Sequence, residues 1–354
     1  MNILITGGSG FIGRFFAEQL SAAGHRLVNL DLVAPDAPAL FARDVRGDVR
    51  DPRAVARGVE GCDAVLHLAA AHHDFGIERD TYFAVNEGAA RVLCTAMDDA
   101  GITKVCFFSS CAVYGDVPEP RHENGPTAPD SHYGASKLAG EAVFREWSGR
   151  GDRRTLVIRP TVTFGPRNFA NMYSLIRQID SGRYLSVGAG TNIKSLSYVE
   201  NIVDATLMLW AREEVPAFNV FNYIDKPDLT SRQIADAIYR ALGRTPPGFS
   251  VPTPLALMLG LPFDAVIALT GKNLPVSTAR IKKLAVAQTK FEADKLAAAG
   301  FTPRVPLTQG IERMVQWYVR EGRAQRPVWH IPPAAVNASA MHGATVTASA
   351  AAAS

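Results

Sequence analysis

Short, nearly continuous apolar segments alternate with longer amphipathic segments through the first half of this 354-residue chain. The apolar segments have the length and β-branched content of strands, and they cover 2–6, 25–31, 62–69, 104–110 and 154–160. The intervening stretches, such as 11–24 and 86–101, have helical patterns and end at glycine. Apolar strands alternating with helices indicate a parallel sheet covered on both faces, so the pattern predicts a doubly wound α/β fold.

Beyond residue 166 the alternation becomes less regular, and helical patterns predominate. A helix is expected over 171–182, a strand that continues into a helix over 195–211, and one further strand around 217–223. Helical segments separated by proline-rich breaks follow between 228 and 325. This part of the chain predicts a smaller, mostly helical lobe.

The two patterns divide the chain into a sheet domain and that lobe. We assign 1–165 to the sheet domain, which also receives about 191–223, and we assign 166–190 and 224–330 to the lobe. The segment 331–354 contains no charged residue and almost no large apolar residue, so it cannot bury enough surface to order itself. We therefore expect a disordered C-terminal tail.

The composition is that of an ordinary soluble protein, with 47% hydrophobic and 20% charged residues. A formal net charge of +3, without a run of Lys or Arg, argues against nucleic acid as a partner. The four cysteines lack metal-ligand spacing, which predicts reduced thiols in a cytoplasmic protein and no metal site. No secretory signal is evident, and Asp264 and two prolines interrupt the apolar segment 254–271, which argues against a membrane span.

Three glycines, Gly7, Gly10 and Gly13, follow the first predicted strand and open the first predicted helix. Glycine at these points allows a tight turn, close approach of the backbone to a pyrophosphate, and packing of the helix on the strand. The helix N-terminus supplies oriented N–H groups for the phosphates. This arrangement predicts a dinucleotide site of the Rossmann type.

An acidic residue, Asp31, ends the second predicted strand. A carboxylate there accepts hydrogen bonds from both hydroxyls of the adenosine ribose and repels a 2′-phosphate, so NAD is favoured over NADP. Arg14 and Arg43 are the cations that would instead favour NADP. Asp48 and Val49, in the segment "GDVRD", are expected at the adenine edge.

The third predicted strand ends in small residues within "LHLAA" (66–70), where bulk would block a bound cofactor. His67 in this segment is interpreted as a core histidine. Asn86 opens a predicted helix, so it is either an N-cap or a functional group.

Ser109 and Ser110 end the next strand, at the edge of the sheet where ligands bind in open α/β folds. About twenty residues later, Tyr133 and Lys137 stand four residues apart, which places them one turn apart on one face of a helix. An ammonium beside a phenol favours the phenolate, and a serine hydroxyl can bind the same substrate oxygen. The combination predicts hydride transfer with a tyrosine base.

These motifs resemble those of the extended short-chain dehydrogenases/reductases, and specifically the NAD-dependent epimerase/dehydratase family, over roughly residues 1–325. The resemblance implies that Tyr133 is the base, that Lys137 holds the cofactor ribose and tunes Tyr133, and that Ser110 polarises the reacting oxygen. Ser110 is chosen over Ser109 because it stands four residues before Tyr114. The matching segments are "TGGSGFIG" (6–13), "GDVRD" (47–51), "HLAA" (67–70), "SSCAVYG" (109–115), "YGASK" (133–137), "RPTVTFGP" (159–166) and "YVENIVDA" (198–205).

The resemblance also implies a set of cofactor contacts that extends over the carboxyl edge of the sheet. The expected set is Gly7, Gly10, Phe11, Ile12, Gly13, Asp31, Asp48, Val49, Leu68, Ala69, Ala70, Asn86, Tyr133, Lys137 and Pro160. A homodimer is expected as well, through the helix 83–99 and the helix that carries Tyr133.

Three departures from the family pattern bear on the reaction. Cys111 and Ala112 occupy the positions where the dehydratases carry an Asp-Glu pair, so dehydration is disfavoured. Val162 replaces an asparagine that usually meets a nucleotide-sugar, and the lobe lacks the usual Arg-x-Gly-Asp segment. The apolar segment 254–271 is instead similar to members that act on sterols and other hydrophobic alcohols.

Other lobe residues favour a diphosphate-bearing substrate. Asn171, Arg177 and Lys194 lie in a region similar to the nucleotide-holding helix and loop of sugar epimerases, and they are the candidate substrate ligands. A solvated helix face explains these charges equally well. The apolar stripe 254–270 is interpreted as lobe core rather than a lipid-binding surface.

Three functional hypotheses follow. The preferred one is an NAD-dependent nucleotide-sugar epimerase, such as a UDP-hexose 4-epimerase, that acts through a 4-keto intermediate. The alternative is an NAD(P)-dependent dehydrogenase of a hydrophobic secondary alcohol of the 3β-hydroxysteroid type, or a nucleotide-sugar ketoreductase. A non-enzymatic nucleotide sensor is disfavoured, because Tyr133 and Lys137 are both present.

Overall fold

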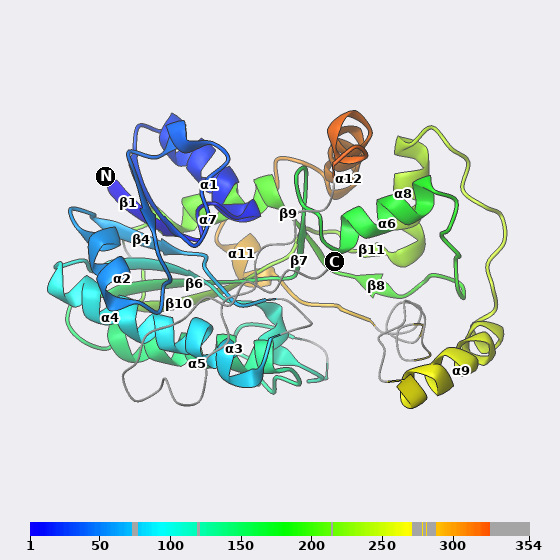
Figure 1. The fold of residues 1–354 in the computed structure, drawn as a ribbon, viewed down its shortest axis with the longest axis horizontal. Helices are drawn as coiled ribbons and strands as arrows, with labels where there is room; N and C mark the ends of the chain where they lie inside the picture. The colour runs from blue at the N-terminus through cyan, green and yellow to red at the C-terminus, as the bar shows by residue number, and fades with distance from the viewer. Residues whose placement is uncertain are drawn as a thin grey trace.

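A seven-stranded sheet forms the larger part of the protein in the computed structural model, which describes residues 1–72, 77–118, 121–213, 215–270, 278, 281 and 288–325 (Figure 1). The strand order is β10-β6-β5-β4-β1-β2-β3, and each neighbouring pair is parallel. The strands are β1 (Asn2–Thr6), β2 (Arg26–Asp31), β3 (Arg43–Arg46), β4 (Ala64–His67), β5 (Lys104–Phe108), β6 (Arg154–Pro160) and β10 (Phe218–Tyr223). The predicted doubly wound fold is confirmed.

One strand, β3, was not expected from the sequence. Its four residues are "RDVR", and only Val45 among them is buried. A short, mostly polar strand at the edge of a sheet lacks the apolar pattern by which strands are recognised.

The two faces of the sheet are covered by different helices, as β1 illustrates. Ile3 and Ile5 belong to one core cluster, with side chains of α1 (Phe11–Ala22) and α7 (Val199–Trp210). Leu4 belongs to the opposite cluster, which contains residues of three further helices. Those helices are α2 (Pro52–Val59), α4 (Ala89–Asp99) and α5 (His132–Ser148).

The helix before β5 begins earlier than the sequence predicts. α3 (Arg79–Phe83), the π-helical turn η2 (Ala84–Gly88) and α4 form one continuous helical run. Asn86 therefore lies inside this run, and its interpretation as an N-cap is wrong.

A third core cluster joins helices of the lobe to one another. It contains side chains of α6 (Asn171–Asp180), α8 (Ser231–Ala241) and α12 (Leu307–Trp317). Two small sheets accompany these helices, β7 (Val162–Phe164) with β9 (Leu196–Tyr198), and β8 (Ile193–Lys194) with β11 (Leu229–Thr230). Shorter elements are η1 (Pro38–Leu40), η3 (Cys111–Tyr114), α11 (Asp294–Ala298) and η4 (Tyr318–Gly322).

The apolar stripe 254–270 forms α9 (Thr253–Thr270), which lies at the outer end of the lobe (Figure 1). Its interpretation as lobe core is wrong, because Met258, Leu259 and Leu261 are each about 60% exposed and the third core cluster contains no α9 residue. Within the described ranges, no helix combines the length and apolar character needed to cross a membrane.

All four cysteines are buried and free, as the sequence predicts. The expected disordered tail, 331–354, lies outside the described residues.

Candidate active site

The carboxyl ends of β1, β4, β5 and β6 lie at the same edge of the sheet, because these strands are parallel. This edge brings together segments that are far apart in the sequence. They are the glycine-rich turn after β1, the residues 68–70 after β4, the serine pair after β5, and Pro160 at the end of β6. The candidate site is therefore at the ligand-binding edge of an open α/β sheet.

The glycine-rich turn has no room for side chains. Gly7 has a φ of 72°, and a Cβ added there would lie 2.7 Å from the backbone N of Ala69. A Cβ on Gly13 would lie 2.5 Å from the carbonyl oxygen of Gly7. Gly10 is the N-cap of α1, so the N–H groups of Phe11 and Ile12 open that helix. The turn fits the pyrophosphate of a dinucleotide at the helix N-terminus.

We expect Gly7→Ala to lower the free energy of unfolding and to weaken NAD binding. A left-handed conformation costs a non-glycine residue roughly 1–2 kcal/mol, and the contact with Ala69 adds to this cost. Gly24→Ala is the matched control, since Gly24 has a φ of 82° but no heavy atom within 4 Å of an added Cβ. In the control Gly24→Ala, urea unfolding should show only the cost of the left-handed backbone, and calorimetry should show the NAD affinity of wild type. Equal NAD affinities in the two variants would contradict the assignment.

The carboxylate of Asp31 is oriented by the same turn. Its two oxygens accept hydrogen bonds from the backbone N of Ser9 at 3.1 Å and of Val33 at 3.3 Å. The two arginines that would favour NADP are engaged elsewhere. Arg14 pairs with Glu18 and Asp36, and Arg43 donates to the carbonyl oxygens of Gly58 and Glu60.

The segment expected at the adenine edge makes internal contacts. Asp48 accepts hydrogen bonds from the backbone and the guanidinium of Arg50, with a shortest distance of 2.6 Å. Val49 is buried in the core cluster that contains Leu4 and the residues of α2, α4 and α5. Both residues hold the loop that follows β3.

His67 is a buried core histidine, as expected. Its Nδ1 lies 2.7 Å from Oγ1 of Thr6, and its ring stacks on Phe107. Burial, together with the charge of Lys137, lowers the pKa of His67 to about 3, so the imidazole is neutral.

Asn86 connects two parts of the candidate site. Its buried amide accepts a hydrogen bond from the backbone N of Ala71 and donates to the carbonyl oxygen of Ala71 and to Oγ of Ser136. Ser136 in turn donates to the carbonyl oxygen of Tyr133. Asn86 thereby fixes the segment after β4 against the helix that carries Tyr133 and Lys137.

The three candidate catalytic residues come from two elements that pack on each other, α5 and η3. Ser110 is the N-cap of η3, and its Oγ accepts a hydrogen bond from the backbone N of Ala112 at 3.1 Å. Gly134, directly after Tyr133, lies so close to the carbonyl oxygen of Ala112 that a Cβ would clash with it. This contact places the Tyr133 turn of α5 beside the Ser110 turn.

Lys137 is almost completely buried one turn after Tyr133. Its Nζ lies 4.3 Å from the centroid of the Phe107 ring. Burial lowers the pKa of Lys137 to about 7, and the nearby charge of Glu141 opposes this shift. A lysine held in this way can exchange its proton near neutral pH.

A buried ion pair, which sequence reasoning missed, supports this region. Arg159 of β6 donates to both carboxylate oxygens of Glu141, at 2.8 and 2.6 Å, and Ser109 donates to the same carboxylate. Arg159 also donates to the hydroxyl of Tyr114. The available signals were an arginine inside an apolar strand and a glutamate one turn after Lys137.

The positions that carry an acid pair in dehydratases hold no titrating acid here. The Cys111 thiol is buried and donates to the carbonyl oxygen of Arg159, and burial raises its pKa far above the ordinary value. Ala112 contributes only its backbone. Neither residue can remove and deliver protons for dehydration.

The three candidate substrate ligands lie on two separate elements, α6 and β8. Asn171 and Arg177 are both exposed on α6, six residues and therefore about 9 Å apart along the helix axis. Lys194 lies in β8, where it pairs with Leu229 of β11. The described contacts do not join these side chains into one cluster.

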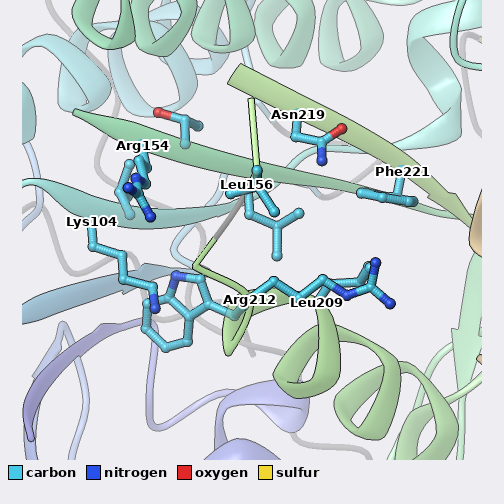
Figure 2. A pocket seen from close by; sticks show the side chains of 11 residues that line it. Lys104, Arg154, Leu156, Leu209, Arg212, Asn219 and Phe221 are labelled. Carbon is cyan, nitrogen blue, oxygen red and sulfur yellow. The ribbon is translucent and has the colours of Figure 1, made fainter. Parts of the chain in front are cut away.

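A separate small pocket lies at the opposite edge of the sheet (Figure 2). Lys104, Arg154 and Asn219 line it from the amino ends of β5, β6 and β10, with Leu209 and Trp210 of α7 on the other side. Because ligands of open α/β sheets bind at the carboxyl ends of the strands, this pocket is not the candidate active site.

The fold and the site together define the class of protein. Residues 3–222 match the NAD dependent epimerase/dehydratase family, so the chain belongs to this family and NAD is its cofactor. The predictions of family, fold and cofactor are confirmed.

Among curated relatives, the chain is 38% identical over 321 residues to the N-acetyl-alpha-D-glucosaminyl-diphospho-ditrans,octacis-undecaprenol 4-epimerase of Escherichia coli O157:H7, covering 89% of this chain and 95% of that protein. It is 24% identical to isoform 1 of the 3beta-hydroxysteroid-dehydrogenase/decarboxylase of Arabidopsis thaliana, covering 88% and 78%. Among solved structures, it is similar to the UDP-glucose 4-epimerase of Thermus thermophilus in complex with NAD, with a TM-score of 0.69, 23% identity and coverage of 90% and 99%.

Proposed function

We propose that the protein is an NAD-dependent 4-epimerase of a sugar that is carried on a diphosphate. The observation that carries the proposal is the packing of the α5 turn that contains Tyr133 on the turn that follows Ser110, at the sheet edge that holds the glycine-rich turn. Neutral residues at Cys111 and Ala112 favour epimerisation over dehydration within the family. The relative from Escherichia coli is named as a 4-epimerase of an N-acetylglucosaminyl diphosphate.

In the proposed mechanism, the Tyr133 phenolate takes the proton from the C4 hydroxyl of the sugar. Ser110 donates a hydrogen bond to the same oxygen and holds it in place. The chemistry supplied by bound NAD is the reversible acceptance of a hydride from C4. The 4-keto sugar then rotates in the site and presents the opposite face of C4. After the hydride has been delivered to that face, Tyr133 returns the proton to the C4 oxygen. The net reaction inverts C4 without net oxidation.

Lys137 acts on this step from one helical turn away. Its ammonium stabilises the Tyr133 phenolate, and it holds the cofactor ribose. Asn86 and Ser136 position the turn of α5 that carries the tyrosine. Arg159 and Glu141 fix the other end of this helix segment against β6. Leu68, Ala69, Ala70 and Pro160 remain the proposed neighbours of the nicotinamide half of the cofactor.

The carrier of the sugar is proposed from the relatives. The 38% identical relative is named as the epimerase of a sugar linked through a diphosphate to undecaprenol, which favours a lipid-linked diphosphate over the nucleotide expected from the sequence. Asn171, Arg177 and Lys194 remain the proposed ligands of the diphosphate. The homodimer and the cytoplasmic location stay predictions.

A dehydrogenase of a hydrophobic alcohol is the second candidate, favoured by the similarity to the Arabidopsis thaliana steroid enzyme. Incubation of the purified enzyme with sugar diphosphates on polyprenol or UDP distinguishes the two functions. An epimerase converts one C4 epimer into an equilibrium mixture without added NAD and without accumulating reduced nicotinamide. Stoichiometric reduced cofactor from a sterol-type alcohol, with no epimer from any sugar, would overturn the proposal.

A further inference from the structure

Helix α9 exposes large apolar side chains on a scale that is unusual for a soluble protein. Met258, Leu259 and Leu261 are 60%, 59% and 59% exposed, and Leu255 and Phe263 are 41% and 40% exposed. At about 100° per residue, these five positions cover roughly 200° of the helix circumference. A helix that is apolar over most of its surface is normally covered by protein or lipid.

The one charged residue of α9 faces away from this surface. Asp264 lies on the opposite side of the helix from the centre of the exposed apolar arc. Its carboxylate accepts hydrogen bonds from the backbone N and the hydroxyl of Thr278. The apolar surface is therefore not interrupted by a charge.

The base of α9 is fixed to the segment that carries Lys194. Before the helix, Val251 forms a β-bridge with Val187, and its backbone N donates to the carbonyl oxygen of Ser186 at 2.8 Å. After the helix, Thr289 forms a bridge with Lys194 itself. The segment that leads into α9 is thus paired with Val187, and Thr289 is paired with Lys194, a proposed diphosphate ligand, seven residues further along.

The exposed apolar surface continues at this base. Phe249, four residues before α9 begins, is 72% exposed, and Leu185, next to the bridged segment, is 65% exposed. The chain from 265 to 289 contains four basic residues, Lys272, Arg280, Lys282 and Lys283, and no acidic residue. A basic segment adjacent to an apolar helix complements an anionic membrane surface rather than a neutral protein face.

We propose that the apolar face of α9 docks into the surface of a lipid bilayer that contains anionic lipids. The inference rests on the proposed function with a lipid-linked sugar diphosphate, because the docked helix would bring Lys194 close to the level of the phosphates. α9 has 18 residues with Pro262 inside, and within the described residues no helix meets the requirements for crossing a membrane. The helix therefore lies in the plane of the interface, with its apolar face among the acyl chains.

Co-sedimentation of the full-length protein with vesicles of phosphatidylcholine and phosphatidylglycerol tests the docking directly. The triple variant Met258→Gln, Leu259→Gln, Leu261→Gln is expected to bind these vesicles at least about 100-fold more weakly, since each buried apolar side chain contributes substantially to partitioning. Val319→Gln is the matched control, because Val319 is 45% exposed on another element. The wild-type protein and the control variant should bind the mixed vesicles equally well. Both should bind vesicles of pure phosphatidylcholine more weakly.

Turnover separates this inference from the proposed function. The triple variant should epimerise a lipid-linked sugar in detergent at the wild-type rate and lose activity only when the substrate is presented in vesicles. Wild-type protein that stays in the supernatant, or a triple variant that binds as well as wild type, overturns the docking. The docking is also overturned if the wild-type protein does not bind vesicles but forms a dimer that the triple variant cannot form. In that case a second copy of the chain covers the apolar face of α9. Failure of wild type to epimerise in detergent overturns the function instead.

Discussion

Tyr133→Phe is expected to lower kcat by roughly 10²- to 10⁴-fold, the range over which a positioned general base or acid contributes. The substitution removes only the hydroxyl. The ring of Tyr133 packs against the core cluster that contains Leu4, and its centroid lies 6.4 Å from that of the Tyr82 ring. Phenylalanine keeps this packing. The variant should therefore fold and retain NAD.

The loss should appear in the chemical step and not in cofactor binding. Single-turnover measurement of C4 inversion, alongside NAD calorimetry, separates the two. Tyr82→Phe is the control, since it removes the hydroxyl of the neighbouring buried ring and should leave turnover close to that of wild type. Wild-type turnover in Tyr133→Phe would show that another group takes the C4 proton.

The elements that the sequence predicted well are those whose signal is local. The apolar strands β1, β5 and β6, the glycines after β1 and the Tyr133–Lys137 spacing each depend on residues within one or two turns of each other. The order of parallel strands then follows from the alternation with helices, and it brings these segments to one edge. The arrival of these segments at one edge of the sheet was predictable for this reason.

What the sequence did not reveal depends on contacts between distant segments. Asn86 looks like an N-cap in the sequence, and only the fold shows its amide between Ala71 and Ser136. The pairing of Glu141 with Arg159 joins a helix and a strand. The exposure of α9 is also a tertiary property, because an apolar segment has the same pattern whether it is covered by protein or lies open.

Lys137→Met is expected to inactivate the enzyme and, in the absence of ligands, to stabilise it at low pH. Burial lowers the pKa of Lys137 to about 7 from an ordinary 10.5. Below pH 7 the folded protein must hold a charged ammonium that the unfolded chain solvates freely, and this lowers the free energy of unfolding. Between about pH 7 and 10.5 mainly the unfolded state binds this proton, so the contribution of Lys137 to stability rises with pH through that window.

Methionine fills similar volume without a charge, so it removes this cost. Urea unfolding at pH 6 should show a gain on the order of 5 kcal/mol, because the pKa falls from 10.5 to about 7 and one pKa unit corresponds to about 1.4 kcal/mol, and the gain should shrink toward pH 10. Turnover should fall by at least roughly 100-fold, since the Tyr133 phenolate loses its neighbouring ammonium. Lys104→Met is the control, because burial also lowers the pKa of Lys104, but at the opposite edge of the sheet. Lys104→Met is expected to raise the free energy of unfolding by a smaller amount and to keep full activity.

A Lys137→Met protein that is less stable than wild type at pH 6, or whose stability difference does not change with pH, would show that Lys137 is not held at a cost. The expected gain in stability and the expected loss of activity have one physical cause. A buried ammonium above the Phe107 ring is unfavourable for the fold, and the proposed mechanism makes use of it, because poor solvation would strengthen its effect on the phenol of Tyr133. Glu141 keeps that cost tolerable, since its charge raises the pKa of Lys137 while Arg159 holds the carboxylate in place.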